Sequence, residues 1–303
     1  MVNGEAPWTC AFCGRPGQRS KEHILAQCLE EILPEAPTTH VAYGIGVGLN
    51  ATGDAYSPMP TEDRRTARKK ILDRVTRDVC TTCNSGWMGA LDEAAKPIIA
   101  RLLDAGRGAM PERLSKSDAR ILTSWAVKTA WTNELANAGD KQRELLLTTQ
   151  AEREALGRGE LPSRTRLWLA RYEGTVIEIA QGHGLRDRHS PPLECETPGR
   201  YVGTAMNLGG VVFLLYTGEV GGFFPALGQD QLAMVWPNVL GAFPPRAATG
   251  EELRTVVTSF GHWVQAHPRP YDSAGVAEFI GPRPIRKQRL ASAKTHRGAQ
   301  SVE

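Results

Sequence analysis

Two cysteine pairs with the same short spacing constrain this chain more than any other feature. Cys10 and Cys13 form the first C-x2-C pair, and Cys80 and Cys83 form the second. Such a turn directs two thiolates to one point, so two turns supply the four sulfur ligands of a structural zinc site. The long interval between the pairs must then loop out and return. The alternative is four ordinary buried cysteines, but the matched pairing favours a metal.

The residues around these pairs form a longer motif. Glu22-His23-Ile24 stands between them, and Asn84 follows Cys83 directly. This pattern resembles the HNH endonuclease family, in the variant whose ββα-metal hairpin is braced by zinc on two C-x2-C knuckles. The stretch from Cys83 to Asp92 also resembles a subgroup of bacterial and phage HNH proteins. The resemblance covers roughly residues 8 to 105, a third of the chain.

The resemblance implies a role for each residue of the motif. His23 would be the general base, and Glu22 and Asn84 would bind a catalytic divalent ion. An imidazole titrates near neutral pH and can take a proton from water. A carboxylate and an amide oxygen suit Mg2+ or Mn2+ better than zinc. The structural alternatives are Glu22 in a first helical turn capped by Ser20, and His23 packed as a hydrogen-bonded histidine beside the knuckle.

The chain departs from the family pattern at two positions. No Asn lies shortly before the second knuckle, and Asn84 stands where the family has its last His. A non-cleaving domain that binds nucleic acid or protein is therefore the alternative to an active nuclease. Asp92 lies about two helical turns past Asn84 and is a reserve ligand at most. We interpret it as a surface carboxylate.

A basic cluster precedes the second knuckle. Between residues 64 and 77 the chain carries seven Arg and Lys residues. Cations near a phosphodiester site supply the salt-dependent part of nucleic-acid affinity, so we expect DNA contact here, against the alternative of a solvated charged face. The residues predicted to bind DNA are Arg64, Arg65, Arg68, Lys69 and Lys70.

Composition and length set outer limits on the interpretation. With 303 residues and a net charge of +3, the chain can hold more than one domain and is only mildly basic. The N-terminus lacks the pattern of a signal peptide, and no apolar run is long enough to cross a membrane. Paired cysteines without a secretion signal indicate metal ligands in a reducing compartment, so we expect a cytoplasmic protein.

Apolar spacing predicts helices in the first half. Residues 24–33 form a short helical pattern, and a longer pattern runs from Asn84 to about residue 105, with Trp87 and Met88 in the core. A third helix spans 115–136, where Ser115 and Asp118 form a capping box. The glycine- and proline-rich insertion predicts loop or short strands.

The second half predicts an antiparallel sheet. We expect two strands joined at Glu173-Gly174, a hairpin from Tyr201 to Tyr216 that turns at Asn207–Gly210, and a strand over 232–236. A helix near 251–260 would follow. Nothing in this half indicates its function.

These patterns together predict an α+β protein. We expect a zinc-knuckle, HNH-like nuclease domain over 1–108 with an insertion at 31–79. Residues 109–280 would form helices and the antiparallel sheet domain, and 281–303 a basic, disordered tail.

Overall fold

The structure is a computed structural model that combines helices with antiparallel sheet, which confirms the expected α+β class. All described elements lie in the unit Met1–Pro270. The described residues are 8–33, 47–49, 56–58, 71–108, 111–138, 146, 148–162, 165–171, 177–186, 199–218, 231–239 and 243. The predicted helix at 251–260, the cluster from Arg64 to Lys70 and the basic tail lie outside them.

A short two-stranded ribbon forms the N-terminal part. Strand β1 (Glu22–His23) pairs antiparallel with β4 (Val75–Thr76), so that Glu22 lies opposite Thr76 and His23 opposite Val75. Between these strands the chain forms a 3-10 helix η1 (Gln27–Glu31), the hairpin strands β2 (Val47–Leu49) and β3 (Tyr56–Pro58), and a 3-10 turn η3 (Ile71–Asp73).

The predicted helix over 24–33 is wrong in type and length. The ribbon extends to Ile24, whose backbone N–H donates to the Arg74 carbonyl at 3.0 Å, so the first residues of the pattern stay extended. Only the five residues of η1 then remain for a helix, and such short pieces favour the 3-10 form.

A long helical run follows the second cysteine pair. It consists of α1 (Thr81–Cys83), the π-type turn η4 (Asn84–Met88) and α2 (Gly89–Gly106). Helix α3 (Lys116–Ala138) comes next, and the predicted capping box is present. The Asp118 backbone N–H donates to Ser115 Oγ at 3.0 Å, and the Ser115 N–H donates to the Asp118 carboxylate at 3.2 Å. Helix α4 (Gln150–Gly157) completes the helical part.

The described strands of the second half form a five-stranded antiparallel sheet. Its order is β6-β7-β8-β5-β9. The strands are β5 (Arg166–Arg171), β6 (Ile177–Arg186), β7 (Gly199–Leu208), β8 (Val211–Gly218) and β9 (Ala233–Trp236). The predicted hairpin is confirmed as β7–β8, with a turn at Gly209 and Gly210, which both have positive φ. The two strands predicted on either side of Gly174 are present as β5 and β6. They do not pair with each other, because β5 lies between β8 and β9.

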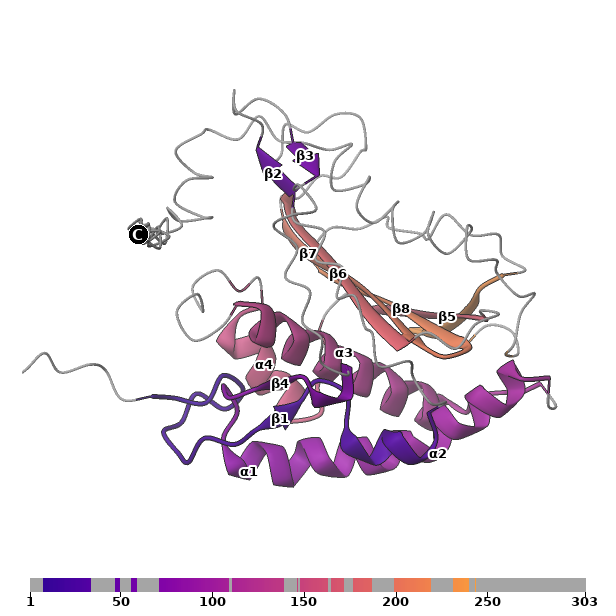
Figure 1. Ribbon diagram of the computed structural model, residues 1–303, viewed down its shortest axis with the longest axis horizontal. Helices are drawn as coiled ribbons and strands as arrows, with labels where there is room; N and C mark the ends of the chain where they lie inside the picture. The colour runs from indigo at the N-terminus through magenta and orange to yellow at the C-terminus, as the bar shows by residue number, and fades with distance from the viewer. Residues whose placement is uncertain are drawn as a thin grey trace, which may run out of the picture. The chain divides into compact units, whose positions relative to one another are not determined.

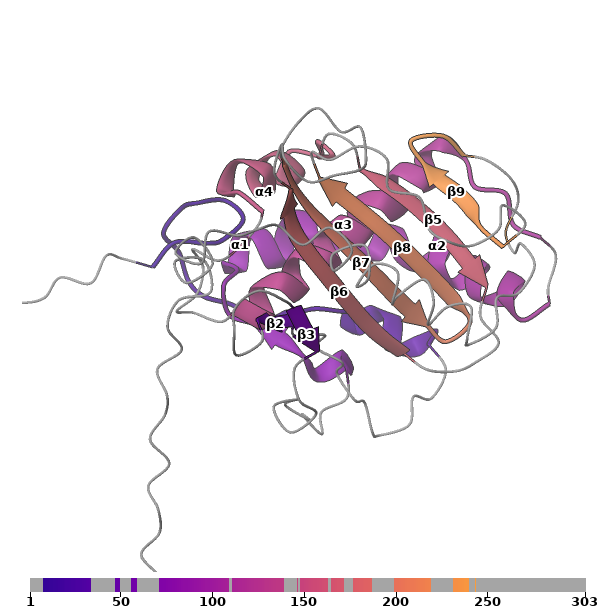
Figure 2. The ribbon, with the colours of Figure 1, turned by 90° about the horizontal axis from the view of Figure 1, so that it is seen from above.

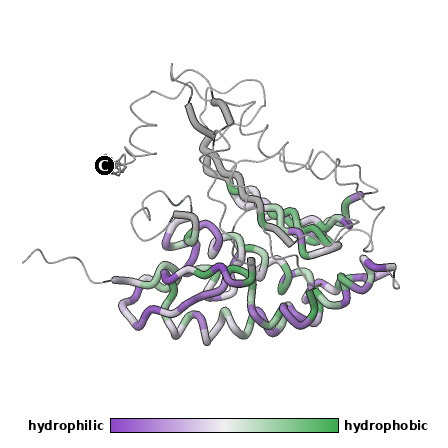
Figure 3. Tube along the Cα trace, in the orientation of Figure 1, coloured by the Kyte–Doolittle hydropathy of each residue, from purple (hydrophilic) through white to green (hydrophobic). Residues whose placement is uncertain are grey.

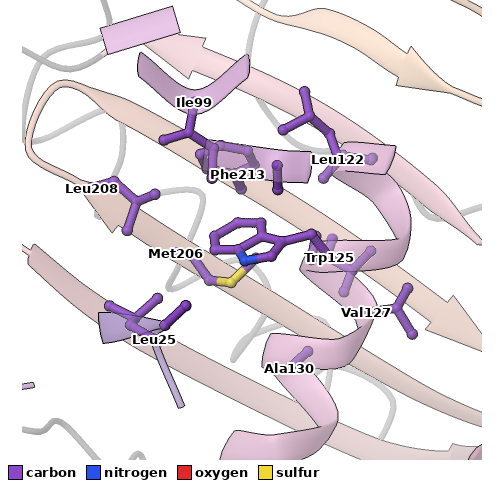
Figure 4. Close-up of a cluster of buried hydrophobic side chains, with 14 of the residues drawn as sticks. Leu25, Ile99, Leu122, Trp125, Val127, Ala130, Met206, Leu208 and Phe213 are labelled. Carbon is purple, nitrogen blue, oxygen red and sulfur yellow. The ribbon is translucent and has the colours of Figure 1, made fainter. Parts of the chain in front are cut away.

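The main core lies between the sheet and helices α2 and α3. Figures 1 and 2 show the helices along one face of the sheet. Trp125 of α3 packs edge-on against Phe213 of β8, with ring centroids 5.4 Å apart, and Figure 4 shows Leu122 and Met206 beside them. Figure 3 shows apolar residues concentrated on the central strands.

The opposite face of the sheet is also buried. Trp168 of β5 is 3% exposed, and Leu214 and Tyr216 of β8 are likewise buried. Burial on both faces explains why these strands are almost continuously apolar rather than alternating. The residues of the candidate site come from the N-terminal knuckle, the ribbon and the helices.

Candidate functional site

The cysteine cluster, Cys10, Cys13, Cys80 and Cys83, converges as the spacing predicts. All four Sγ atoms lie within 4.8 Å of one another, and Cys13 Sγ and Cys80 Sγ are 3.8 Å apart. Four Zn–S bonds of about 2.3 Å in tetrahedral geometry place sulfur atoms at about this separation. The donor set is therefore compatible with a structural zinc.

Local backbone geometry brings the two cysteine pairs together. Cys80 is the N-cap of α1, and its Sγ accepts the Cys83 backbone N–H at 3.4 Å. Cys10 Sγ accepts the Cys80 backbone N–H at 3.3 Å, which joins the pairs directly. Gly14 follows the first pair with a φ of 67°, which a residue with a side chain rarely adopts. A sulfur atom of each knuckle thus accepts a backbone N–H, an arrangement that stabilises thiolates.

The thiols of the cluster share their protons unequally. A hydrogen bond from Cys83 lowers the pKa of Cys10 to about 4. The same bond, together with burial, raises the pKa of Cys83 far above its ordinary value, and burial raises the pKa of Cys13. One thiolate forms readily, and its negative charge opposes ionisation of the others. A divalent cation would remove this opposition and allow all four to ionise.

The first knuckle is anchored on the rest of the fold. The Ala11 backbone N–H donates to the Asp78 carbonyl at 2.7 Å, and Arg153 Nε of α4 donates to the Ala11 carbonyl at 2.6 Å. Phe12 packs edge-on against Trp87 of η4, with ring centroids 5.7 Å apart. Trp87 therefore packs beside the knuckle, and Met88 is fully buried, in line with the core role predicted for both.

His23 is half-buried on β1, and one hydrogen bond determines which of its ring nitrogens carries a proton. Its Nδ1 lies 2.8 Å from the carbonyl oxygen of Leu72 in η3. A carbonyl can only accept, so Nδ1 carries a proton, and in the neutral ring Nε2 then holds the lone pair. The ring is thus held in the tautomer that a general base needs.

Glu22 belongs to a group of charged side chains that we name the buried triad: Glu22, Asp92 and Lys128. Lys128 of α3 is 0% exposed, and its Nζ lies 2.9 Å from Glu22 Oε1. Both carboxylate oxygens of Asp92, in α2, are also 2.9 Å from Nζ. The interpretation of Asp92 as a surface carboxylate is wrong, because the residue is only 8% exposed and binds a lysine.

Burial dominates the electrostatics of the triad. Desolvation raises the pKa of Glu22 and of Asp92, although Lys128 acts in the opposite direction. Burial also opposes the charge on Lys128, but Asp92 and Glu22 outweigh it and raise the pKa of the ammonium. Lys128 is therefore a firmly protonated cation between two carboxylates.

Asn84 lies in the first turn after the second knuckle and holds the segment before β1. Its Nδ2 donates to Ser20 Oγ at 3.1 Å and to the Lys21 carbonyl at 3.1 Å. Ser20 Oγ in turn donates to the Val79 carbonyl at 3.0 Å. The helix is distorted here, with Gly86 at φ −91° and ψ −114°. Asn84 thus ties this distorted turn to β1.

The two predicted ligands of a divalent ion have other partners in the structure. Glu22 Oε1 accepts a hydrogen bond from Lys128. The Asn84 amide nitrogen donates to Ser20 and to Lys21. Glu22 Oε2 and Asn84 Oδ1 make no hydrogen bond to another described residue. The cysteine cluster is the one group of His, Cys, Asp and Glu in the described residues that gathers three or more ligand atoms. A divalent ion on Glu22 and Asn84 stays a prediction.

Sequence reasoning missed Lys128 and the Leu72 carbonyl. The sequence pattern could have revealed Lys128. It lies seven residues after Ile121 and three after Trp125, and therefore on the apolar stripe of α3. A lysine on a core stripe requires a buried anionic partner. The Leu72 carbonyl has no signal, since a backbone acceptor does not depend on residue type.

Comparison of the chain with protein-family models, curated proteins and solved structures finds no match. Among the described helices, none combines the length and the apolar character that crossing a membrane requires.

Proposed function

We propose that this protein is a metal-dependent endonuclease of the HNH type that hydrolyses phosphodiester bonds in DNA. The observation that carries the proposal is the hydrogen bond from His23 Nδ1 to the Leu72 carbonyl. It prepares Nε2 to take a proton from water, which is the task of a general base in hydrolysis.

The surroundings of His23 support the proposal. The ribbon β1–β4 leads into a helix that starts at the cysteine cluster, the order of elements expected of a zinc-braced ββα hairpin. Lys21 and Arg77 adjoin the paired residues Glu22 and Thr76, and both are exposed. Two exposed cations beside a general base suit a phosphate backbone.

The roles in the reaction follow from these positions. His23 Nε2 would take the proton of the attacking water. Asn84, through its bonds to Ser20 and Lys21, would fix the backbone before β1. Glu22 and Asn84 remain the residues proposed to hold Mg2+ or Mn2+, through the oxygens that the described residues leave unbonded. Such an ion stabilises negative charge on phosphate oxygens.

A second candidate is a catalytically inactive zinc module that binds nucleic acid or protein. The contact of Glu22 with Lys128 favours it, because this contact occupies one oxygen of the proposed ligand. The cysteine cluster serves equally well in a binding module.

Incubation of the zinc-loaded protein with supercoiled plasmid and Mg2+ or Mn2+ separates the two candidates. We expect nicked or linear product, and a loss of about 100- to 10,000-fold in rate for His23→Ala with DNA affinity nearly unchanged. His183→Ala, in β6, is the matched control and should cleave as wild type does. Wild-type protein that binds DNA but does not cleave it with any divalent ion would support the binding module instead.

The basic cluster can be tested in the same assay. Joint neutralisation of Arg68, Lys69 and Lys70 should weaken binding to all sequences alike. It should also reduce the slope of log affinity against log salt by about 0.9 for each phosphate that the variant no longer neutralises. An unchanged slope would mean that these residues form a solvated face and that the protein binds DNA through other residues.

A further inference from the structure

Lys128 joins three elements that are distant in sequence. It projects from α3 and binds Glu22 of β1 and Asp92 of α2, each at 2.9 Å. The ammonium is 0% exposed, while Glu22 is 4% exposed. Water therefore has little access to the ion pair between Lys128 and Glu22. The ion pair fixes the distance between β1 and the helices.

Stability alone is a poor explanation for this triad. Moving charges out of water carries a large desolvation penalty, and apolar residues of similar volume often serve a core equally well. A buried ion pair does, however, impose one geometry on its partners, since the ammonium must meet both carboxylates. Such a device is useful where a backbone segment has to be held in one position.

Strand β1 is a segment of this kind. It has two residues, Glu22 and His23, and its pairing with the segment around β4 extends on either side to Ser20 and Ile24, whose N–H groups donate to the Val79 and Arg74 carbonyls. Isolated ribbons are marginal even when longer, so the position of β1 depends on contacts outside the ribbon. On the buried side Glu22 contacts Lys128, and the adjacent His23 reaches the Leu72 carbonyl. Just before the strand, Asn84 Nδ2 donates to the Lys21 carbonyl.

We propose that Lys128 is a positioning residue for His23, acting through the Glu22 carboxylate on strand β1. With Glu22 pinned to α3, the backbone of β1 presents the imidazole to the Leu72 carbonyl and fixes the proton on Nδ1. The consequence for DNA cleavage rests on the proposed function, whereas the effect on the ring of His23 does not.

The test compares Lys128→Met with a matched destabilised variant. Lys128→Met keeps an unbranched, flexible side chain, one atom shorter than lysine, and removes the charge. Leu122→Ala is the control, because Leu122 is a fully buried residue of α3 with no part in the triad. A buried Leu→Ala change and a broken buried ion pair destabilise a protein by similar amounts. Any difference between the variants then reflects position rather than stability.

The readout is the tautomer of His23, observed by nitrogen-15 NMR of the imidazole in zinc-loaded protein at low temperature. We expect the Nδ1–H form in wild type and in Leu122→Ala, and a mixture containing Nε2–H in Lys128→Met. Cleavage should fall about 100-fold in Lys128→Met at saturating DNA, the cost of a displacement of about 1 Å in a reacting group. A wild-type tautomer in folded Lys128→Met would overturn the proposal.

Two further measures keep the test decisive. If Lys128→Met does not fold, Lys128→Met with Asp92→Asn removes one buried anion as well and leaves only Glu22 unpartnered. We expect the same mixture of tautomers, and a wild-type spectrum would again overturn the proposal. If wild-type protein does not cleave DNA, the proposed function fails, while the spectra still decide the role of Lys128.

Discussion

The cysteine cluster and the buried triad meet the same electrostatic requirement in different ways. Each gathers groups that become anions in a place with little water. The triad contains its own cation, Lys128, supplied by α3. The cysteine cluster ionises fully only with a cation from outside. One cluster should therefore depend on solution conditions, and the other on a single side chain.

The largest effect should follow removal of zinc. Structural zinc in small knuckles contributes about 10 kcal/mol or more of apparent binding free energy, so a strong chelator should unfold the knuckle. Cys80→Ser should bind no stoichiometric zinc and lose most of its thermal stability. Metal content by plasma spectrometry and unfolding by circular dichroism check this.

The control for zinc removal is Cys28→Ser. Cys28 packs at the edge of the core, outside the cysteine cluster, so this variant should keep one zinc per chain. Equal zinc content in Cys80→Ser and Cys28→Ser would show that the cysteine cluster is not a metal site.

The second effect concerns the internal cation. Lys128→Met should cost about 3–5 kcal/mol in the free energy of unfolding near neutral pH, because two buried carboxylates lose their partner. The loss of stability from Lys128→Met should not depend on zinc, because the triad contains no cysteine ligand. Denaturant unfolding of the zinc-loaded variant measures it.

The pH dependence of this loss has a definite sign. Burial raises the pKa of Glu22 and Asp92, so the folded protein binds protons more tightly than the unfolded chain. Stability from these groups is present at low pH and is lost as pH rises through the folded values. Without Lys128 those values rise further. Lys128→Met should therefore regain stability relative to wild type as the pH falls from neutral; a constant difference would contradict the triad.

The third effect distinguishes two roles of Asn84. As a tether, Asn84 needs its N–H donors, and loss of two hydrogen bonds costs about 1–3 kcal/mol. As a metal ligand it needs its oxygen. Asn84→Asp keeps the oxygen and removes the donors, so it should match Asn84→Ala in stability and exceed it in Mn2+-dependent cleavage.

Ser85→Ala is the control for Asn84, since Ser85 is exposed in the same turn and should show neither change. Equal activity of Asn84→Asp and Asn84→Ala would leave Asn84 as a tether alone.

The contrast between the clusters also marks what sequence could predict. The cysteine cluster has a spacing signature, so its convergence and the following helices were predictable from Cys10, Cys13, Cys80 and Cys83. The capping box at Ser115 and the β7–β8 turn were local patterns as well. Local chemistry determines such features, and sequence displays it directly.

The remainder depends on long-range pairing. Glu22 and Lys128 are 106 positions apart, and no spacing rule links a carboxylate on a strand with a lysine on a later helix. The placement of β5 between β8 and β9 likewise depends on which strands cover the helices. The contact of Glu22 and Asp92 with Lys128 therefore could not be predicted from the sequence.

The smallest expected effect tests whether the start of α3 shares in positioning the triad. Ser115 caps α3 well before Lys128 in sequence, and Ser115→Ala should cost about 1 kcal/mol, the usual value of a lost N-cap. Since the buried triad fixes α3 against β1 and α2, fraying of the first turn should leave the tautomer of His23 and the zinc content unchanged. Ser117→Ala, exposed in the same turn, is the control for removal of a hydroxyl group. A change in the His23 spectrum of Ser115→Ala would mean that the position of Lys128 depends on the helix start as well as on its two carboxylates.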